Sequence, residues 1–366
     1  MNSIVNVARS EPEKEAEERI LAEFANLTNG EVYDQLKKRL LTLKRGVNVV
    51  GGSSDYLASD GYELLTYLLQ NTLRGVIDSS HEHNKEAHIL DVSSGGGEII
   101  DWFYAQEVHR STHRKNYNMH IIETNKKIIE SYNEKVKKNA FLELENHEGK
   151  IQDCYKSTSK TRPKFQKPLD FVSFMHAIHH LTDYTSEDFN PYADITNSLK
   201  YIYGLLKPGG AIFIAYHDAS SEFISTNIDY HKERLSSSAI VERVNKTIKA
   251  REELLYDGAI LETLRKEDSK TIAKLESHQI SSSFYAKTLA DMAVIGLSGE
   301  LLKTDNEKFD NGKLKYLLEN IKNSATADVR KGERRKYGLC RAERGREALW
   351  RVECPLFICI IRKEIV

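Results

Sequence analysis

Apolar residues at helical spacing dominate the first part of the chain. Between residues 13 and 45 they recur every three or four positions, and Asn29-Gly30 interrupts the run, which predicts two amphipathic helices. A third helix is predicted over Tyr62–Ile77, because its leucines and Val76 fall on one side. We therefore expect residues 1–85 to form an N-terminal helical region that caps the rest of the chain.

From residue 86 the pattern changes to short apolar runs of the kind that form buried strands. Strands are predicted over His88–Val92, Met119–Glu123, Lys150–Cys154, Leu169–Met175, Ala211–Tyr216 and Leu356–Ile361. Helical segments separate the first five, and such alternation is typical of a parallel sheet with helices on both faces. The expected fold class is α/β and Rossmann-like, with its core over residues 86–220 and a C-terminal part over residues 281–366.

The segment between these two parts is rich in charge. Lys232–Glu276 is too polar for the interior of a sheet, so residues 221–280 are predicted to be a charged helical insertion. This insertion could cover a pocket as a lid or provide a surface for self-association, and the sequence does not decide between the two roles.

The composition excludes several classes of protein. Hydrophobic residues make up 40% and charged residues 29% of the chain, as in ordinary globular domains. The 53 Lys and Arg against 54 Asp and Glu give a net charge of −1, so no global field attracts nucleic acid, and no apolar run approaches the about 18 residues of a membrane helix. The four cysteines form no CxxC pair, which argues against a disulfide framework or a zinc finger. We expect a cytoplasmic protein that binds neither membrane nor nucleic acid.

A glycine-rich loop follows the first predicted strand. The sequence LDVSSGGGE runs from Leu90 to Glu98 and leads into a helical segment. Glycines let the backbone approach a ligand, and a helix N-terminus offers unpaired N–H groups. Glu123 ends the second strand, where an acid can accept hydrogen bonds from two ribose hydroxyls. Asp153, at the end of the third predicted strand, could accept a hydrogen bond from an adenine amino group.

This ordered set, with LKPGG at Leu206–Gly210 before a strand, resembles the class I S-adenosylmethionine-dependent methyltransferases. The resemblance implies a mostly parallel seven-stranded sheet, S-adenosylmethionine as cofactor and S-adenosylhomocysteine as product. A dinucleotide dehydrogenase would need GxGxxG, whereas here three glycines cluster before Glu98. An NAD(P)-binding or merely structural Rossmann-like domain is the alternative.

Within that superfamily the chain resembles the histamine N-methyltransferase group from about Asp55 onward, with one insertion. The likeness is carried by Ile89–Asp101, Lys156–Ser159, Leu169–Asp183, Asn311–Asn320 and Asn323–Arg330. The last two segments are the most specific, because methyltransferases in general need no such sequence there.

This resemblance and the strand-end pattern together assign residues to both sides of the reaction. The residues expected at the cofactor are Asp91, Ser93, Gly95, Gly96, Gly97, Glu123, Asp153, Ser159 and Met175. The catalytic candidates are His176, where the family has a pocket glutamine, and His179 and His180, where it has paired aromatics. The substrate-binding candidates are Asp60, Glu63, Tyr216, His217 and Cys354. Because the pocket positions depart from the family, the reaction can be kept while the substrate is not histamine.

Methyl transfer to a neutral nitrogen requires alignment more than acid–base help. We therefore expect N-methylation of a small amine or imidazole compound, with His176 as an orienting group. Small-molecule O-methylation, methylation of protein or RNA, and a scaffold without activity are the alternatives. His176, His179 and His180 have the i, i+3, i+4 spacing of helical metal ligands, but carboxylates are sparse beside them, so no metal is expected there.

Overall fold

The computed structural model describes residues 7–8, 10–32, 35–36, 56–57, 60–81, 86–93, 117–124, 126–137, 142–155, 165, 167–182, 186–217, 221–234, 238–267, 270–297, 307–327, 336–344 and 347–366. The chain divides into two compact units. The core unit comprises residues 65–216, 242–279 and 357–366, and the second unit comprises residues 1–64, 217–241 and 280–356. Neither unit is contiguous in the sequence.

The core unit is built on a seven-stranded sheet. In spatial order its strands are β4 (Leu142–Glu148), β3 (Tyr117–Glu123), β2 (Ala87–Val92), β5 (Leu169–Met175), β6 (Leu206–His217), β11 (Leu356–Ile365) and β7 (Thr271–Ile280). The pairs β4–β3, β3–β2, β2–β5 and β5–β6 are all parallel. The predicted Rossmann-like fold with a mostly parallel seven-stranded sheet is confirmed.

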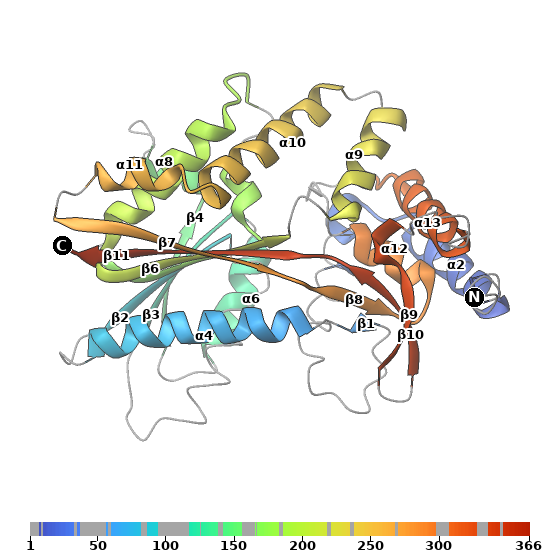
Figure 1. The fold of residues 1–366 in the computed structure, drawn as a ribbon, viewed down its shortest axis with the longest axis horizontal. Coiled ribbons are helices and arrows are strands. Elements are labelled where there is room, and N and C mark those ends of the chain that lie inside the picture. Colours follow the sequence, from blue (N-terminus) through green and yellow to red (C-terminus); the bar gives the residue numbers. More distant parts are fainter. Residues whose placement is uncertain are drawn as a thin grey trace. The chain divides into compact units, whose positions relative to one another are not determined.

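Helices cover both faces of this sheet (Figure 1). One face carries α4 (Asp60–His81) and α6 (Lys126–Lys137), and the other carries α8 (Pro191–Leu205), α10 (Ser238–Arg251) and α11 (Ile260–Arg265). Shorter helical segments are α7 (Ile151–Tyr155), η1 (Ile178–Leu181) and η2 (Glu252–Tyr256). Because both faces are covered, every residue of β2 is buried, as expected for a strand inside a parallel sheet.

The third strand does not lie where the sequence placed it. Residues 150–154 were predicted to be a strand, but Ile151–Tyr155 forms helix α7 and the strand is β4. The Asp153 carboxylate accepts a hydrogen bond from the Lys150 N–H at 3.1 Å, an arrangement that favours the start of a helix. Strand β4 lies at the edge of the sheet and has exposed Glu143 and Glu145, so it lacks the apolar run that marked the other strands.

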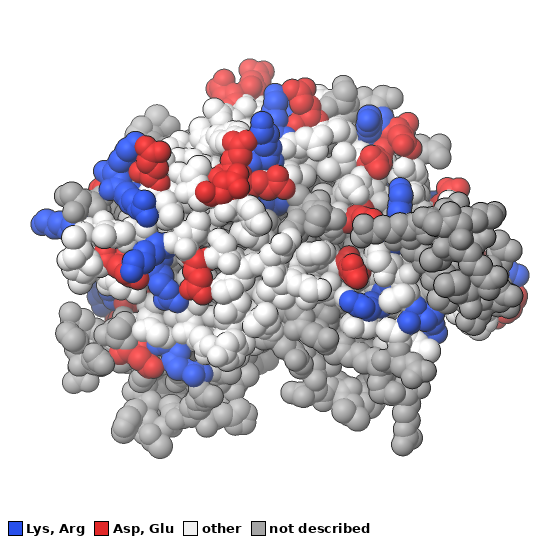
Figure 2. Space-filling model, in the orientation of Figure 1, with Lys and Arg blue, Asp and Glu red and all other residues white. Residues whose placement is uncertain are grey.

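The charged segment 221–280 is helical only in part. Helices α9 (Glu222–Arg234), α10 and α11 are followed by β7, the other edge strand of the sheet. The helical surface carries exposed i, i+4 pairs such as Glu242–Lys246, at 2.7 Å. On the face shown in Figure 2, the described Lys and Arg side chains are interspersed with Asp and Glu.

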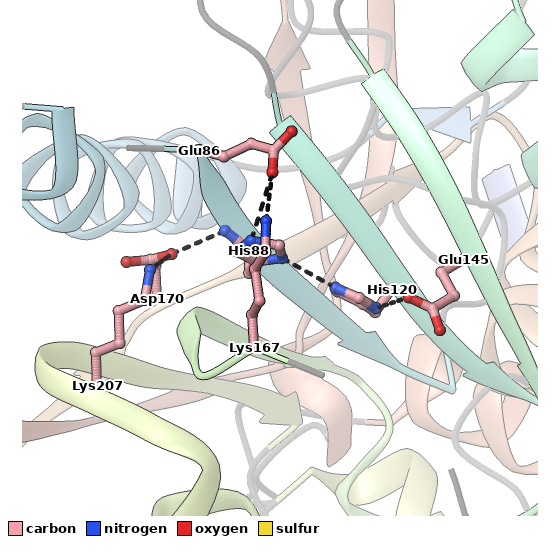
Figure 3. Close-up of polar contacts among 7 residues, drawn as sticks. All are labelled: Glu86, His88, His120, Glu145, Lys167, Asp170 and Lys207. Atoms are coloured by element: carbon pink, nitrogen blue, oxygen red, sulfur yellow. Dashed lines mark hydrogen bonds and ion pairs between the residues drawn. The ribbon is translucent and has the colours of Figure 1, made fainter. Parts of the chain in front are cut away.

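A buried carboxylate ties three strands together at their amino-terminal ends. Asp170 of β5 is 1% exposed. Its Oδ2 accepts a hydrogen bond from the His88 N–H of β2 at 2.8 Å and lies 2.6 Å from Lys207 Nζ of β6 (Figure 3). A buried carboxylate is costly without such partners, so this contact fixes strands whose opposite ends form the candidate site.

The second unit has a four-stranded antiparallel sheet. Its order is β1 (Tyr56–Leu57), β8 (Ser283–Ala286), β10 (Glu347–Glu353) and β9 (Cys340–Arg344). Its helices include α2 (Glu11–Phe24), α9, α12 (Leu289–Leu297) and α13 (Asn311–Thr326). The Glu13 carboxylate of α2 accepts hydrogen bonds from Trp350 Nε1 at 2.7 Å and from the Leu289 N–H at 2.8 Å, which joins α2, β10 and α12.

No helix in the described ranges is both long and apolar enough to cross a lipid bilayer.

Candidate functional site

The order of the strands marks one edge of the core sheet as the candidate site. From β2 the chain proceeds outward to β3 and β4, and then returns to β5 and β6 on the other side of β2. Ligands of open α/β sheets bind at the carboxyl ends of the strands beside such a reversal. The predicted residues Asp91, Ser93, Glu123 and Met175 all lie at or next to these strand ends.

Asp91 is almost completely buried, with 1% of its surface exposed. Its Oδ1 accepts a hydrogen bond from Ser173 Oγ of β5 at 2.5 Å, and its Oδ2 accepts one from Tyr132 OH of α6 at 2.6 Å. The carboxylate therefore connects β2 to β5 and α6 just before the glycine-rich loop. Sequence reasoning missed Tyr132 and Ser173. A serine inside the apolar strand Leu169–Met175 was the available signal, because a buried hydroxyl requires a partner.

Ser93 begins the loop in a left-handed conformation, with φ of 52°, which is uncommon for a residue other than glycine. Its N–H donates to the Ile122 carbonyl of β3 at 2.9 Å, so the chain leaves β2 in a fixed direction. The loop glycines Gly95, Gly96 and Gly97, and Ser159, lie outside the described residues, and their roles stay predictions.

Glu123 ends β3, as predicted, and is 8% exposed. Its Oε1 accepts a hydrogen bond from the Thr124 N–H at 2.8 Å. Its carbonyl oxygen accepts one from the Gly149 N–H at 3.2 Å. A buried carboxylate at this strand end is suited to bind vicinal hydroxyl groups. Asp153 follows the third strand, and one of its oxygens binds the Lys150 N–H as described above.

His176 follows the last residue of β5. Met175 pairs with Ala215 of β6, and the His176 N–H donates to the Ala215 carbonyl at 2.7 Å. His176 has φ of 56°, so the backbone turns sharply at the carboxyl edge of the sheet. Backbone outliers of this kind gather at functional sites.

His179 and His180 lie in the short helix η1, which begins after the turn at His176. The three histidines therefore do not share one α-helix, whereas a helical metal site with i, i+3, i+4 spacing would require them to. The Gln152 side chain of α7 donates to the His180 carbonyl at 2.8 Å and holds the segment in place. The His179 side chain lies outside the described residues.

The substrate-binding candidates fall in different surroundings. Tyr216 is 5% exposed, and its ring packs against the Arg251 guanidinium at 4.3 Å and the Phe357 ring at 5.1 Å in the core unit. Asp60 and Glu63 lie on α4, and their side chains are outside the described residues.

His217 and Cys354 contact each other in the second unit. Cys354 Sγ lies 3.3 Å from His217 Nδ1 and 3.4 Å from Ser221 Oγ. The Cys354 N–H donates to the Ser282 carbonyl at 2.8 Å, and the side chain is buried. Two residues that the sequence assigned separately to a pocket are therefore neighbours.

Comparisons with known proteins agree on the kind of domain. A family described as "Methyltransferase domain" matches residues 63–257, more than half of the 366 residues. No curated protein sequence matches the chain.

Several solved structures are similar to the chain. A Bacillus halodurans protein provisionally designated a methyltransferase has 12% identity and a TM-score of 0.44, over 80% of this chain and 99% of that one. The plantazolicin methyltransferase BamL has 12% identity and a TM-score of 0.34, over 90% and 97%. The N-methyltransferase NodS of Bradyrhizobium japonicum has 8% identity and a TM-score of 0.34, over 88% and 97%. Because these identities and TM-scores are low, the assignment to the methyltransferase domain family rests on the family match and on the strand order.

Proposed function

Because the chain belongs to the methyltransferase domain family, we propose that it transfers a methyl group from S-adenosylmethionine to a nitrogen of a small amine or imidazole compound. S-adenosylmethionine is the cofactor and S-adenosylhomocysteine the product of this chemistry. The choice of a small nitrogen acceptor rests on the resemblance of the sequence to the histamine N-methyltransferase group.

The residues at the carboxyl edge of the core sheet fit this cofactor. The observation that carries the proposal is the buried Glu123 carboxylate at the end of β3, beside the reversal of strand order. Ribose hydroxyls would give this carboxylate the further donors that offset its burial. Asp91 would act indirectly, by positioning the glycine-rich loop. Its hydrogen bonds to Tyr132 and Ser173 fix the end of β2, from which this loop departs.

When bound, the cofactor supplies an electrophilic methyl group on a sulfonium. The chain then has to align an acceptor nitrogen with that group and exclude water, and alignment can contribute about 7–11 kcal/mol in well-oriented systems. His176 is the candidate for this positioning. It lies at the carboxyl edge of the sheet, and its backbone is fixed by the bond to Ala215. Its imidazole would orient the acceptor or take up its proton.

The described surface charges favour a small acceptor over RNA. The described charges on the face in Figure 2 are mixed in sign, whereas RNA-binding surfaces gather positive charge.

The decisive experiment supplies isotope-labelled S-adenosylmethionine to a panel of imidazoles and aliphatic amines, matched phenols and catechols, total protein and total RNA. Label in the amines and imidazoles alone supports the proposal. Label only in hydroxyl compounds, protein or RNA refutes the small nitrogen acceptor.

Two variants separate the cofactor role from the acceptor role. Glu123→Ala should raise the Kd of S-adenosylhomocysteine about 10- to 100-fold, because a hydrogen bond to a charged group contributes about 1.5–3 kcal/mol. His176→Ala should leave that Kd unchanged and lower kcat/KM for the acceptor at least tenfold. His278→Ala, on the edge strand β7, is the control. Unchanged kcat/KM in His176→Ala would show that this histidine has no positioning role.

A further inference from the structure

Three histidines lie on neighbouring strands of the core sheet: His88 on β2, His120 on β3 and His147 on β4. Figure 3 shows the first two, with Glu145 of β4 beside His120. His120 of β3 is paired in register with Glu145 of β4, and Ile122 with His147. Paired residues of neighbouring strands project from the same face of a sheet. The side chains of His120, Glu145 and His147 therefore share one face at the edge of the sheet, and we call them the edge triad.

The ligand atoms of the edge triad are close enough to share one ion. Glu145 Oε2 lies 3.1 Å from His120 Nδ1, and Glu145 Oε1 lies 3.9 Å from His147 Nε2. One atom from each of the three residues lies within 4.8 Å of the other two. In a tetrahedral zinc site with bonds of 2.0–2.1 Å, neighbouring ligand atoms are roughly 3.3 Å apart. Small rotations of the side chains would reach this geometry.

The surroundings of the triad match those of a metal site. The His120 and His147 side chains are 6% and 10% exposed, and the Phe165 ring packs against both imidazoles at 5.5 and 4.8 Å. His147 Nε2 is buried and has no hydrogen-bond partner in the part of the chain that the structure describes. Glu145 is 52% exposed, which leaves an approach from solvent and room for a water ligand.

A fourth histidine supports His120 from the other side. His88 Nδ1 of β2 lies 3.3 Å from His120 Nε2. If His120 donates its Nε2–H to His88, its buried Nδ1, which makes no hydrogen bond with the described residues, keeps the lone pair that a metal ion would bind. Metal-bound histidines generally use their second ring nitrogen in this way.

We propose that His120 Nδ1, His147 Nε2 and the Glu145 carboxylate bind a divalent transition-metal ion, with Zn²⁺ the best match to two imidazoles and one carboxylate. The ion would link the edge strand β4 to β3, and its ligand on β3, His120, lies three residues before Glu123.

The test is calorimetric titration of the EDTA-treated full chain with Zn²⁺, followed by native mass spectrometry. The wild type should bind one equivalent that Glu145→Gln and His147→Ala weaken at least tenfold. His278→Ala is the matched control. Glu276 and His278 are two residues apart on β7, as Glu145 and His147 are on β4, and His278 Nε2 lies 2.7 Å from Glu276 Oε1. Among the described residues, however, this pair belongs to no group of three ligands. This variant should bind Zn²⁺ as the wild type does.

Two further measurements keep the outcome interpretable. Unchanged S-adenosylhomocysteine binding shows that a variant is folded. If His147→Ala does not fold, Glu145→Gln still tests the site, because Glu145 is exposed and its substitution should leave the fold intact. A Co²⁺ derivative should show ligand-field bands without a thiolate charge-transfer band, which excludes a cysteine site. The proposal is overturned if the bound equivalent survives Glu145→Gln and His147→Ala, or if the wild type takes up no Zn²⁺.

Discussion

Removing the hydroxyl of Tyr132 tests whether Asp91 is the anchor of the loop that follows β2. Tyr132 OH donates to Asp91 Oδ2 at 2.6 Å, and both residues are 1% exposed. Hydrogen bonds to charged groups contribute about 1.5–3 kcal/mol, against about 0.5–1.5 kcal/mol for neutral ones. Tyr132→Phe should therefore lower the free energy of opening of the core unit by about 2 kcal/mol.

The assay is native-state hydrogen exchange of the β2 and β5 amides, because it reports on the core unit separately from the second unit. The same substitution in an Asp91→Asn background should cost about 1 kcal/mol, since the acceptor is then neutral. Tyr67→Phe, at a tyrosine that is 59% exposed, is the control and should change the free energy by less than about 0.5 kcal/mol. The reasoning fails if Tyr132→Phe costs less than about 0.5 kcal/mol, or costs as much in the Asp91→Asn background as in the wild type.

Three further predictions follow from contacts in the two units. Gly296→Ala should destabilise the protein by about 1–3 kcal/mol in urea unfolding, because a Cβ on α12 would lie 2.7 Å from the Phe223 ring. Gly75→Ala is its control: a Cβ there in α4 meets nothing within 4 Å, so this change should stabilise the protein by up to about 1 kcal/mol. Lys207→Met should cost about 3–5 kcal/mol, because it leaves the buried Asp170 carboxylate without its charged partner, and a loss below about 1 kcal/mol would contradict the role given to this pair. Burial raises the pKa of Tyr337 to about 12, above the value of about 10 for an unfolded chain. The unfolded state therefore loses this proton first, and stability should fall by about 2 kcal/mol between pH 10 and 12. Tyr337→Phe should show a correspondingly smaller loss, and equal pH profiles would refute the assignment.

In the core sheet the interior strands could be located from the sequence, whereas the edge strands β4 and β7 could not. β2 and β5 are covered on both faces and appear as apolar runs. Both edge strands carry exposed charged side chains such as Glu145 and Lys274. Their sequences therefore resemble a loop and a surface helix. Lys150–Cys154 was predicted to be a strand because the two buried apolar residues of the short helix α7, Ile151 and Cys154, give the pattern of a short strand.

The candidate site shows a similar division. The position of Glu123 at a strand end follows from the order of motifs, and the structure places it there. The edge triad was not predicted, because His120, Glu145 and His147 come from two strands and show no spacing motif for a metal. Only the register of β3 with β4 brings them together. The partners of Asp91 were missed for the same reason, since Tyr132 and Ser173 come from distant parts of the chain.

The position of β11 between β6 and β7 has a consequence for synthesis on the ribosome. β7 ends at Ile280 and β11 begins at Leu356, so β7 emerges well before the strand that joins it to the rest of the sheet. A nascent chain that has not reached residue 356 can assemble only the five strands from β4 to β6. During that interval β7 needs another partner or a chaperone, and a stop codon before residue 356 would make this temporary state permanent.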